Sequence, residues 1–305
     1  MKEELNIHGA RWNSAHDGYF SDPGIALPFL EAVSRRITDT KPGVVADLGG
    51  GTGFILAELS KRHAPAAVRY INVDVSARQL CECTDENIRS LNCCVTEVSR
   101  DALMMETPTM GTDRGKRGLS PFNLMLIMRS VLHYLGRDGA APFLEHLRAQ
   151  MKPGEMLIHQ TACFESRQEA DCANRLYALM RTPKWYPTVD DLHRTLKAAG
   201  WQVVDCQPAP SLRLKSQDLA ERYNLSAADL AQIRRELGAM GTDIKLSGTS
   251  IIGDRSGLLG LLGTDLGLLG LLGTDLNLSP IILSPIIPDF TAFLHYRIFT
   301  CRAMA

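Results

Sequence analysis

The chain has 305 residues, of which 45% are hydrophobic and 22% are charged, proportions typical of a globular protein with a sizeable core. Lysine and arginine number 33 against 34 acidic residues, so charge does not favour a nucleic-acid partner. The first twenty residues lack the apolar run that secretion requires, and no run predicts a membrane span. We therefore expect a cytoplasmic protein.

The eight cysteines are expected to be reduced thiols, mostly buried. No pair of CxxC motifs occurs among them, and a chain of this size does not need disulfides to fold. We therefore predict no metal site.

Residues 1–40 are expected to form an N-terminal helical cap. The apolar residues of GIALPFLEAVSRRI, at 24–37, are spaced as in an amphipathic helix.

From Val44 onward, apolar runs typical of strands alternate with helix patterns. Such alternation predicts an α/β fold with a doubly wound, mostly parallel seven-stranded sheet, helices on both faces, and ligands at the carboxyl ends of the strands. We assign this Rossmann-like domain to residues 41–208. Strands are expected at 44–48, 68–75, 92–99, 123–130, 156–162 and 201–207, and helices at 54–64, 77–91, 142–151 and 188–200.

After Pro208 this rhythm stops. We expect an insertion at 209–289, with a helix at 226–240 and GLLGLLGTDL at 257–266 repeated letter for letter at 267–276. Two copies of ten residues favour a tandem duplication in a connector over a solenoid, although a hydrophobic lid or surface anchor remains an alternative. Residues 290–305 are expected to supply the last strand of the same sheet.

A glycine-rich turn follows the first expected strand. The dinucleotide fingerprint GxGxxG fails here, because its last position falls on Phe54 or Leu56. What is present is Asp47 followed by alternate glycines, and Asp74 then ends the second expected strand. The glycines are Gly49, Gly51 and Gly53.

These residues resemble the Rossmann-like (class I) S-adenosylmethionine-dependent methyltransferases. Residues 44–53 are similar to the first motif of that family, and VDVS at 73–76 is similar to the second. SRDA at 99–102, NLMLIMRSVLHYL at 123–135 and KPGEMLI at 152–158 resemble later motifs. The resemblance covers about 40–206 and the final strand.

The resemblance implies S-adenosyl-L-methionine as the cofactor and a role for each motif. Gly49, Gly51 and Gly53 would let the backbone pass the methionyl part, and Asp47 would hold its amino group. Asp74, with Val75 beside it, would accept the ribose hydroxyls. Asp101 would meet the adenine amino group and Ala102 would leave room for the ring, while the turn after the fourth strand would contribute Met128 and Arg129.

Each acid also has a purely structural interpretation. Asp47 suits a turn, Asp74 a solvated strand end and Asp101 a helix N-cap. Their order at successive strand ends favours the cofactor interpretation.

Three residues near the expected site are candidates for a general base, which methyl transfer to a hydroxyl would use. His133 follows the fourth strand, where the resemblance places a catalytic histidine in one group of small-molecule O-methyltransferases. His159 lies in the fifth expected strand and Glu165 just beyond it. The alternatives are a capping or core histidine in each case, and a solvated Glu165.

The acceptor is expected to be a small molecule. Base-modifying relatives carry NPPY or DPPY after the fourth strand, where this chain has Met128-Arg129-Ser130. The pocket could be walled by five aromatic residues that could equally be core: Trp12, Tyr19, Phe20, Trp185 and Tyr186.

We therefore expect a methyltransferase that methylates a small-molecule hydroxyl, with no nucleic-acid partner and with a homodimer left open. The alternative is a protein that binds S-adenosylmethionine without catalysis, as a sensor or scaffold.

Overall fold

The computed structural model describes residues 15–63, 67–105, 123–240 and 290–305. Trp12 and the repeat at 257–276 lie outside these ranges. The chain forms two units, residues 1–212 with 294–305, and residues 213–293.

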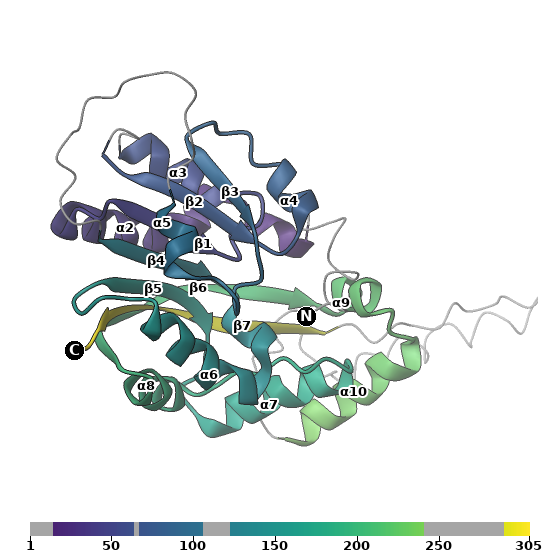
Figure 1. The fold of residues 1–305 in the computed structure, drawn as a ribbon. Coiled ribbons are helices and arrows are strands. Elements are labelled where there is room, and N and C mark those ends of the chain that lie inside the picture. The colour runs from purple at the N-terminus through teal and green to yellow at the C-terminus, as the bar shows by residue number, and fades with distance from the viewer. Residues whose placement is uncertain (1–14, 64–66, 106–122, 241–289) are drawn as a thin grey trace, which may run out of the picture. The chain divides into compact units, whose positions relative to one another are not determined.

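The main unit is built on the predicted seven-stranded sheet (Figure 1). Its strand order is β3-β2-β1-β4-β5-β7-β6. β1 pairs in parallel with β2 and β4, as do β2 with β3 and β4 with β5, whereas β7 runs antiparallel to β5. The strands are β1 (Val44–Leu48), β2 (Arg69–Asp74), β3 (Ile88–Asn92), β4 (Leu124–Arg129), β5 (Met156–Ala162), β6 (Trp201–Lys215) and β7 (Thr291–Ala303).

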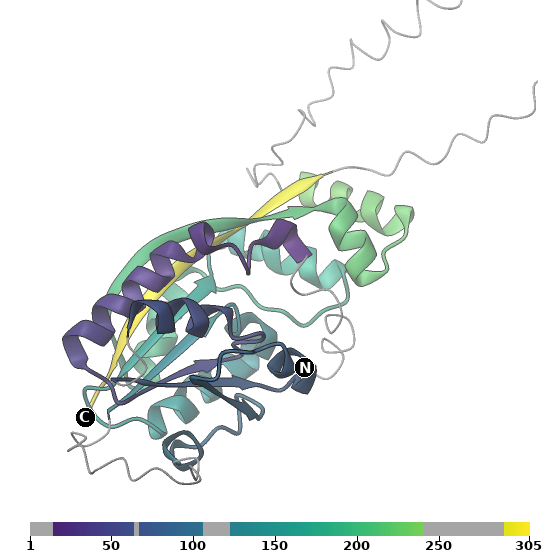
Figure 2. The same ribbon diagram turned by 90° about the horizontal axis from the view of Figure 1, so that it is seen from above.

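Helices cover both faces of the sheet, as the two views in Figures 1 and 2 show. The fold class predicted from the sequence is thus confirmed. The helices of this unit are η1 (Ala15–Gly18), α2 (Pro23–Thr40), α3 (Phe54–Arg62), α4 (Ala77–Cys81), α5 (Arg100–Met104), η2 (Leu132–Leu135), α6 (Gly136–Ala149), α7 (Arg167–Leu179) and α8 (Val189–Ala198).

Two apolar clusters hold the sheet between these helices. On one face, which we call the α3 face, α2 and α3 pack on Val45, Met125 and Ile158. On the other, the α6 face, α6 and α8 pack on Leu126 and its neighbours. Successive strand residues point to opposite faces, so β1, β4 and β5, buried along their whole length, contribute apolar residues to both clusters.

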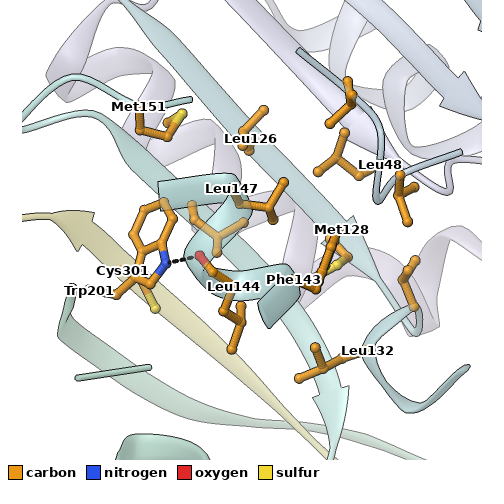
Figure 3. Close-up of a cluster of buried hydrophobic side chains, with 14 of the residues drawn as sticks. Leu48, Leu126, Met128, Leu132, Phe143, Leu144, Leu147, Met151, Trp201 and Cys301 are labelled. Carbon is orange, nitrogen blue, oxygen red and sulfur yellow. Dashed lines mark hydrogen bonds between the residues drawn. The ribbon is translucent and has the colours of Figure 1, made fainter. Parts of the chain in front are cut away.

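Figure 3 shows the α6 face at close range. Leu144 and Leu147 of α6 belong to the same cluster as Leu126, and the indole N–H of Trp201 donates to the Leu144 carbonyl over 2.9 Å. This bond satisfies the polar atom of a side chain that is otherwise wholly buried.

One expected helix and one expected strand are wrong. The helix expected at 77–91 ends at Cys81, and Ile88–Asn92 forms β3 instead, pairing with β2 from Tyr70 to Asp74. Residues 93–99, expected as part of a strand, contain a turn at 95–97 and no strand. β3 lies at the edge of the sheet and buries only Ile88 fully, so its sequence lacks the continuous apolar run of a central strand.

The second unit includes α9 (Ser216–Tyr223) and α10 (Ala227–Ala239). Ser226 caps α10 and exchanges hydrogen bonds with Asp229, a capping box. The start of β7 is fixed to the start of α9 by two bonds between Ser216 and Phe290. The helix expected at 226–240 is therefore present.

No helix in the described ranges is long and apolar enough to cross a membrane. All eight cysteines are free thiols, but only Cys163, Cys172 and Cys301 are buried and Cys81 is exposed. The thiols are thus less buried than expected.

A buried ion pair fixes the amino end of β5. The Glu155 carboxylate accepts two bonds from Arg100, at 2.7 and 2.8 Å, and one each from the backbone N–H groups of Leu124 and Lys152. Arg100 opens α5, so this carboxylate ties α5, β4 and β5 together.

We predict that Glu155→Gln lowers the free energy of unfolding by about 3 kcal/mol, because the half-buried Arg100 loses its charged partner. Urea unfolding would measure the loss. Glu58→Gln, which breaks the ion pair with the exposed Lys61, should cost about 0.5 kcal/mol or less. Equal effects of the two substitutions would contradict this account.

Candidate functional site

Four polar side chains lie on the α3 face, near the carboxyl ends of four neighbouring strands. Asn72 lies opposite Asp47 in the β2–β1 register, and Arg129 lies opposite Gln160 in the β4–β5 register. Each residue stands two positions after a member of the α3-face cluster, so all four share that face. We call Asn72, Asp47, Arg129 and Gln160 the polar row.

The polar row is buried and incompletely bonded. Asn72, Asp47 and Gln160 are at most 1% exposed and Arg129 is 8% exposed. Among the described residues, no partner reaches either carboxylate oxygen of Asp47 or three further atoms of the row. Those atoms are Asn72 Oδ1, Gln160 Oε1 and Arg129 Nε. Buried polar atoms without partners are costly, so the polar row is a candidate binding site.

The glycine-rich turn passes directly over Asp47 and Asn72. Gly49, Gly51 and Gly53 have φ values of 73°, 57° and 78°, in the left-handed region that side chains disfavour. Gly50 is needed for a different reason, since a Cβ there would lie 2.3 Å from Asn72 Oδ1 and 2.8 Å from Asp47 Cγ. The turn can therefore lie against the polar row only as bare backbone.

The surroundings of Asp47 disfavour its charged form. Its pKa is raised from 3.8 to about 7, mainly by burial and also by the neighbouring carboxylate of Asp74, while the Arg129 guanidinium opposes both effects. The side chain is therefore poised between its neutral and charged forms near neutral pH.

Asp74, at the end of β2, is 8% exposed and is bonded to the same turn. Its carboxylate accepts from the backbone N–H of Gly51 over 3.0 Å and from that of Ser76 over 2.8 Å. Burial raises the pKa of Asp74, and these N–H donors lower it. Val75 follows it and is 38% exposed. The bond to Gly51 places Asp74, and with it Val75, beside the glycine turn.

Asp101 and Ala102 lie in α5, which follows β3. Ser99 caps this helix by accepting from the Ala102 N–H over 3.2 Å. Asp101 is exposed, and the Ala102 carbonyl accepts from Arg89 of β3 over 2.9 Å. The N-cap that the alternative interpretation assigned to Asp101 is therefore Ser99.

Met128 and Arg129 point to opposite faces of the sheet. Met128 is fully buried in the α6-face cluster with Phe143 and Leu132 (Figure 3), away from the polar row. Arg129 belongs to the row, and its two terminal nitrogens donate to the carbonyls of Tyr19 and Phe20, each over 3.2 Å. The structure thus brings Arg129, and not Met128, to the side of Asp47.

His133 lies in η2, directly after β4, and is 5% exposed. Its ring stacks on Tyr186 at 5.4 Å and lies 4.1 Å from the ring of Tyr134. Its carbonyl accepts from the Trp185 N–H over 3.1 Å. His133 and two of the predicted wall residues are thus neighbours.

His159 is placed differently, in the middle of β5 on the α6 face. Its ring is fully buried, stacks on Phe299 at 5.1 Å, and shares a 2.8 Å bond between Nδ1 and Thr161 Oγ1. Burial lowers its pKa to about 3, so it is neutral. It is not brought together with the polar row. Glu165 is exposed and pairs with Arg297.

Sequence reasoning missed three members of this site: Asn72, Gln160 and Gly50. Asn72 and Gln160 are buried polar residues at interior positions of β2 and β5. A polar residue in such a strand is the signal that could have identified them. Gly50 lies within the motif at 44–53. Its side-chain-free position is required by its closeness to Asn72, which the sequence alone does not reveal.

A family model described as a methyltransferase domain matches residues 27–205, more than half of the chain. The chain belongs to this methyltransferase family. This confirms the recognition of a class I S-adenosylmethionine-dependent methyltransferase from its motifs. No curated protein matches the chain.

Solved structures share the fold at low sequence identity. The YcgJ protein of Bacillus subtilis has a TM-score of 0.51 and 11% identity, covering 90% of this chain and 98% of its own. A putative methyltransferase of Bacillus halodurans has a TM-score of 0.53 and 11% identity, covering 92% and 99%. At this identity the two relatives support the fold of the methyltransferase alone.

We predict that Gly50→Ala destabilises this methyltransferase by about 1–3 kcal/mol, the scale of overpacking, because the new Cβ meets Asn72 and Asp47. Urea unfolding would measure the loss. Gly238→Ala in α10, where a Cβ meets nothing within 4 Å, serves as the matched control and should not destabilise. A Gly50→Ala variant as stable as the wild type would disprove the close approach.

We predict that Asp47→Asn stabilises the ligand-free protein, and does so more at high pH. In the wild type the folded state holds a proton between about pH 4 and 7 that the unfolded state has lost, so Asp47 costs more stability as the pH rises through this window. Relative to the wild type, the variant should therefore gain about 2–3 kcal/mol between pH 5 and pH 8.

Urea unfolding of both proteins at the two pH values checks this. Other titrating groups, His159 included, cancel in the difference between the proteins. A difference that does not change with pH would show that Asp47 titrates normally.

Proposed function

We propose that this methyltransferase transfers a methyl group from S-adenosylmethionine to a hydroxyl group of a small-molecule acceptor. The observation that carries the proposal is the polar row, whose unpartnered buried atoms lie under the bare glycine turn.

The chemistry of these atoms fits the amino-acid part of the cofactor. The two Asp47 oxygens, Asn72 Oδ1 and Gln160 Oε1 are acceptors, which suits an ammonium with three N–H donors. Binding a cation there would also favour the charged form of Asp47, whose burial is otherwise unfavourable.

The remaining predicted residues would serve the adenosyl part. Asp74 keeps acceptor capacity for a ribose diol, because two bonds to backbone N–H groups use only part of what a carboxylate can accept. Asp101 is exposed at the start of α5 and can accept from an adenine amino group, with the small Ala102 beside it. Met128 does not take part, since its side chain belongs to the core of the other face.

The bound cofactor would supply a methyl carbon already activated by its sulfonium, so the chain has to align the acceptor and exclude water. His133 would take the proton that the acceptor hydroxyl loses. Its ring is held between Tyr134 and Tyr186, which would fix its orientation. His159 is the weaker candidate, because it is neutral, fully buried and stacked within the core.

A small acceptor is supported by the residues around His133. The ammonium of the buried Lys184 lies 4.6 Å from the ring of Tyr134 and 5.2 Å from that of Tyr177, and the Tyr177 ring lies 4.8 Å from that of Tyr186. Aromatic faces and one cation suit a planar organic molecule.

The proposal is tested first by calorimetry with S-adenosylhomocysteine. Asp74→Asn should weaken binding by about 1–3 kcal/mol, because an uncharged amide replaces a carboxylate that would accept the ribose hydroxyls. Asp39→Asn, an exposed acid at the end of α2, is the matched control and should bind as the wild type does. Failure of the wild type to bind would overturn the proposal.

Turnover is tested with labelled S-adenosylmethionine and a panel of phenols, alcohols and amines. Transfer to a hydroxyl, lost in His133→Ala while cofactor affinity persists, is the expected result. Tight cofactor binding without transfer to any acceptor would instead indicate a sensor or scaffold. Full activity of His133→Ala would remove this histidine as the base.

A further inference from the structure

Arg129 is unusual within the polar row because it is bonded to a segment far away in the sequence. Its terminal nitrogens donate to the carbonyls of Tyr19 and Phe20, and its Cζ lies 5.2 Å from the ring of Tyr19 and 5.5 Å from that of Phe20. Hydrogen bonds and cation–π contacts therefore hold one guanidinium to two successive residues.

The neighbouring member of the row holds the same segment. Gln160 Nε2 donates to the Tyr19 hydroxyl over 3.2 Å, and that hydroxyl donates to the Pro210 carbonyl over 2.5 Å. The ring of Tyr19 also lies 5.7 Å from that of Tyr296 in β7. Tyr19 is only 4% exposed, so residues 15–21 are fixed to β4, β5, β6 and β7 through this side chain.

Arg129 also acts on Asp47. Among the described residues, the charged groups that influence the Asp47 carboxylate are Asp74 at the end of β2 and Arg129 at the end of β4. Only Arg129 carries the opposite sign. Burial lowers the pKa of Arg129, and Tyr19, Tyr296 and Asp47 act in the opposite direction.

We infer that Arg129 is a positioning residue with two linked effects: it holds residues 15–21 beside the polar row, and it keeps Asp47 charged for the cofactor ammonium. The inference rests on the proposed function and assigns to Arg129 a part other than direct contact with the cofactor. Both terminal nitrogens of Arg129 bond to the carbonyls of Tyr19 and Phe20, and its guanidinium lies near both rings. Its influence on the ligand therefore passes through Asp47 and through this segment.

The first test is the pH dependence of S-adenosylhomocysteine binding, measured by calorimetry from pH 5.5 to 8.5. In the wild type the affinity should rise as Asp47 ionises near pH 7. Arg129→Met and Arg129→Gln remove the charge, and each should move the midpoint of this rise upward by about one pH unit. At pH 7 this corresponds to several-fold weaker binding, recovered in large part at pH 8.5.

Arg129→Lys is the matched control, since it keeps the charge but not the paired donors. Its midpoint should stay close to that of the wild type. Hydrogen exchange should nevertheless quicken in all three variants at the amides of Tyr19 and Asp22, which bond to the carbonyls of His16 and Gly18. A background of His16→Gln removes the histidine of that segment, and Asp47→Asn removes the titrating carboxylate.

In the Asp47→Asn background, Arg129→Met should leave the remaining pH profile unshifted. A loss of affinity by the same factor at every pH, or a midpoint moved equally by Arg129→Lys, would overturn the inference. So would a wild-type affinity that does not vary with pH. If the wild type binds no S-adenosylhomocysteine at any pH, the proposed function itself fails.

Discussion

The site depends on one unfavourable interaction, a carboxylate buried in the sheet with no hydrogen-bond donor among the described residues. Asp47 is 1% exposed, both its oxygens lack such a partner, and burial raises its pKa to about 7. A carboxylate in this condition lowers the stability of the empty protein above pH 4. It becomes favourable only when a cation binds beside it, which is how a binding site differs from a core.

The rest of the fold supports this buried charge. The apolar clusters on both faces hold β1 and β4 in register, so Asp47 cannot move out to solvent. The turn lies over Asp47 as backbone alone because Gly50 leaves no room for a Cβ. Arg129 supplies a positive charge without bonding to the carboxylate oxygens. At the opposite end of β4, the Glu155 carboxylate accepts from the backbone N–H of Leu124.

The sequence predicted the sheet well where each strand is a central one. β1, β4 and β5 are short runs buried on both faces, so their composition alone identifies them. β3 was missed because an edge strand buries few side chains, and Ile88–Asn92 reads as the end of a helix. Which strands become edges is decided by tertiary pairing, which no local pattern contains.

Within the site, the motif residues were predictable and their environment was not. Asp47 and the glycines form a contiguous pattern, but Asn72 and Gln160 join them only through strand register. Met128 and Arg129 are adjacent in sequence, and the alternation of β4 sends one to the core and the other to the polar row. The contact of Arg129 with Tyr19 joins residues 110 positions apart, beyond the reach of any spacing rule.

The charge of Asp47 can be measured directly as the number of protons exchanged when S-adenosylhomocysteine binds. Calorimetry at pH 6.5, in buffers that differ in ionisation enthalpy, gives that number. The account predicts that the wild type releases a large fraction of a proton, since the bound ammonium drives Asp47 to its charged form, and that Asp47→Asn releases much less. Binding that releases no proton from the wild type would contradict it.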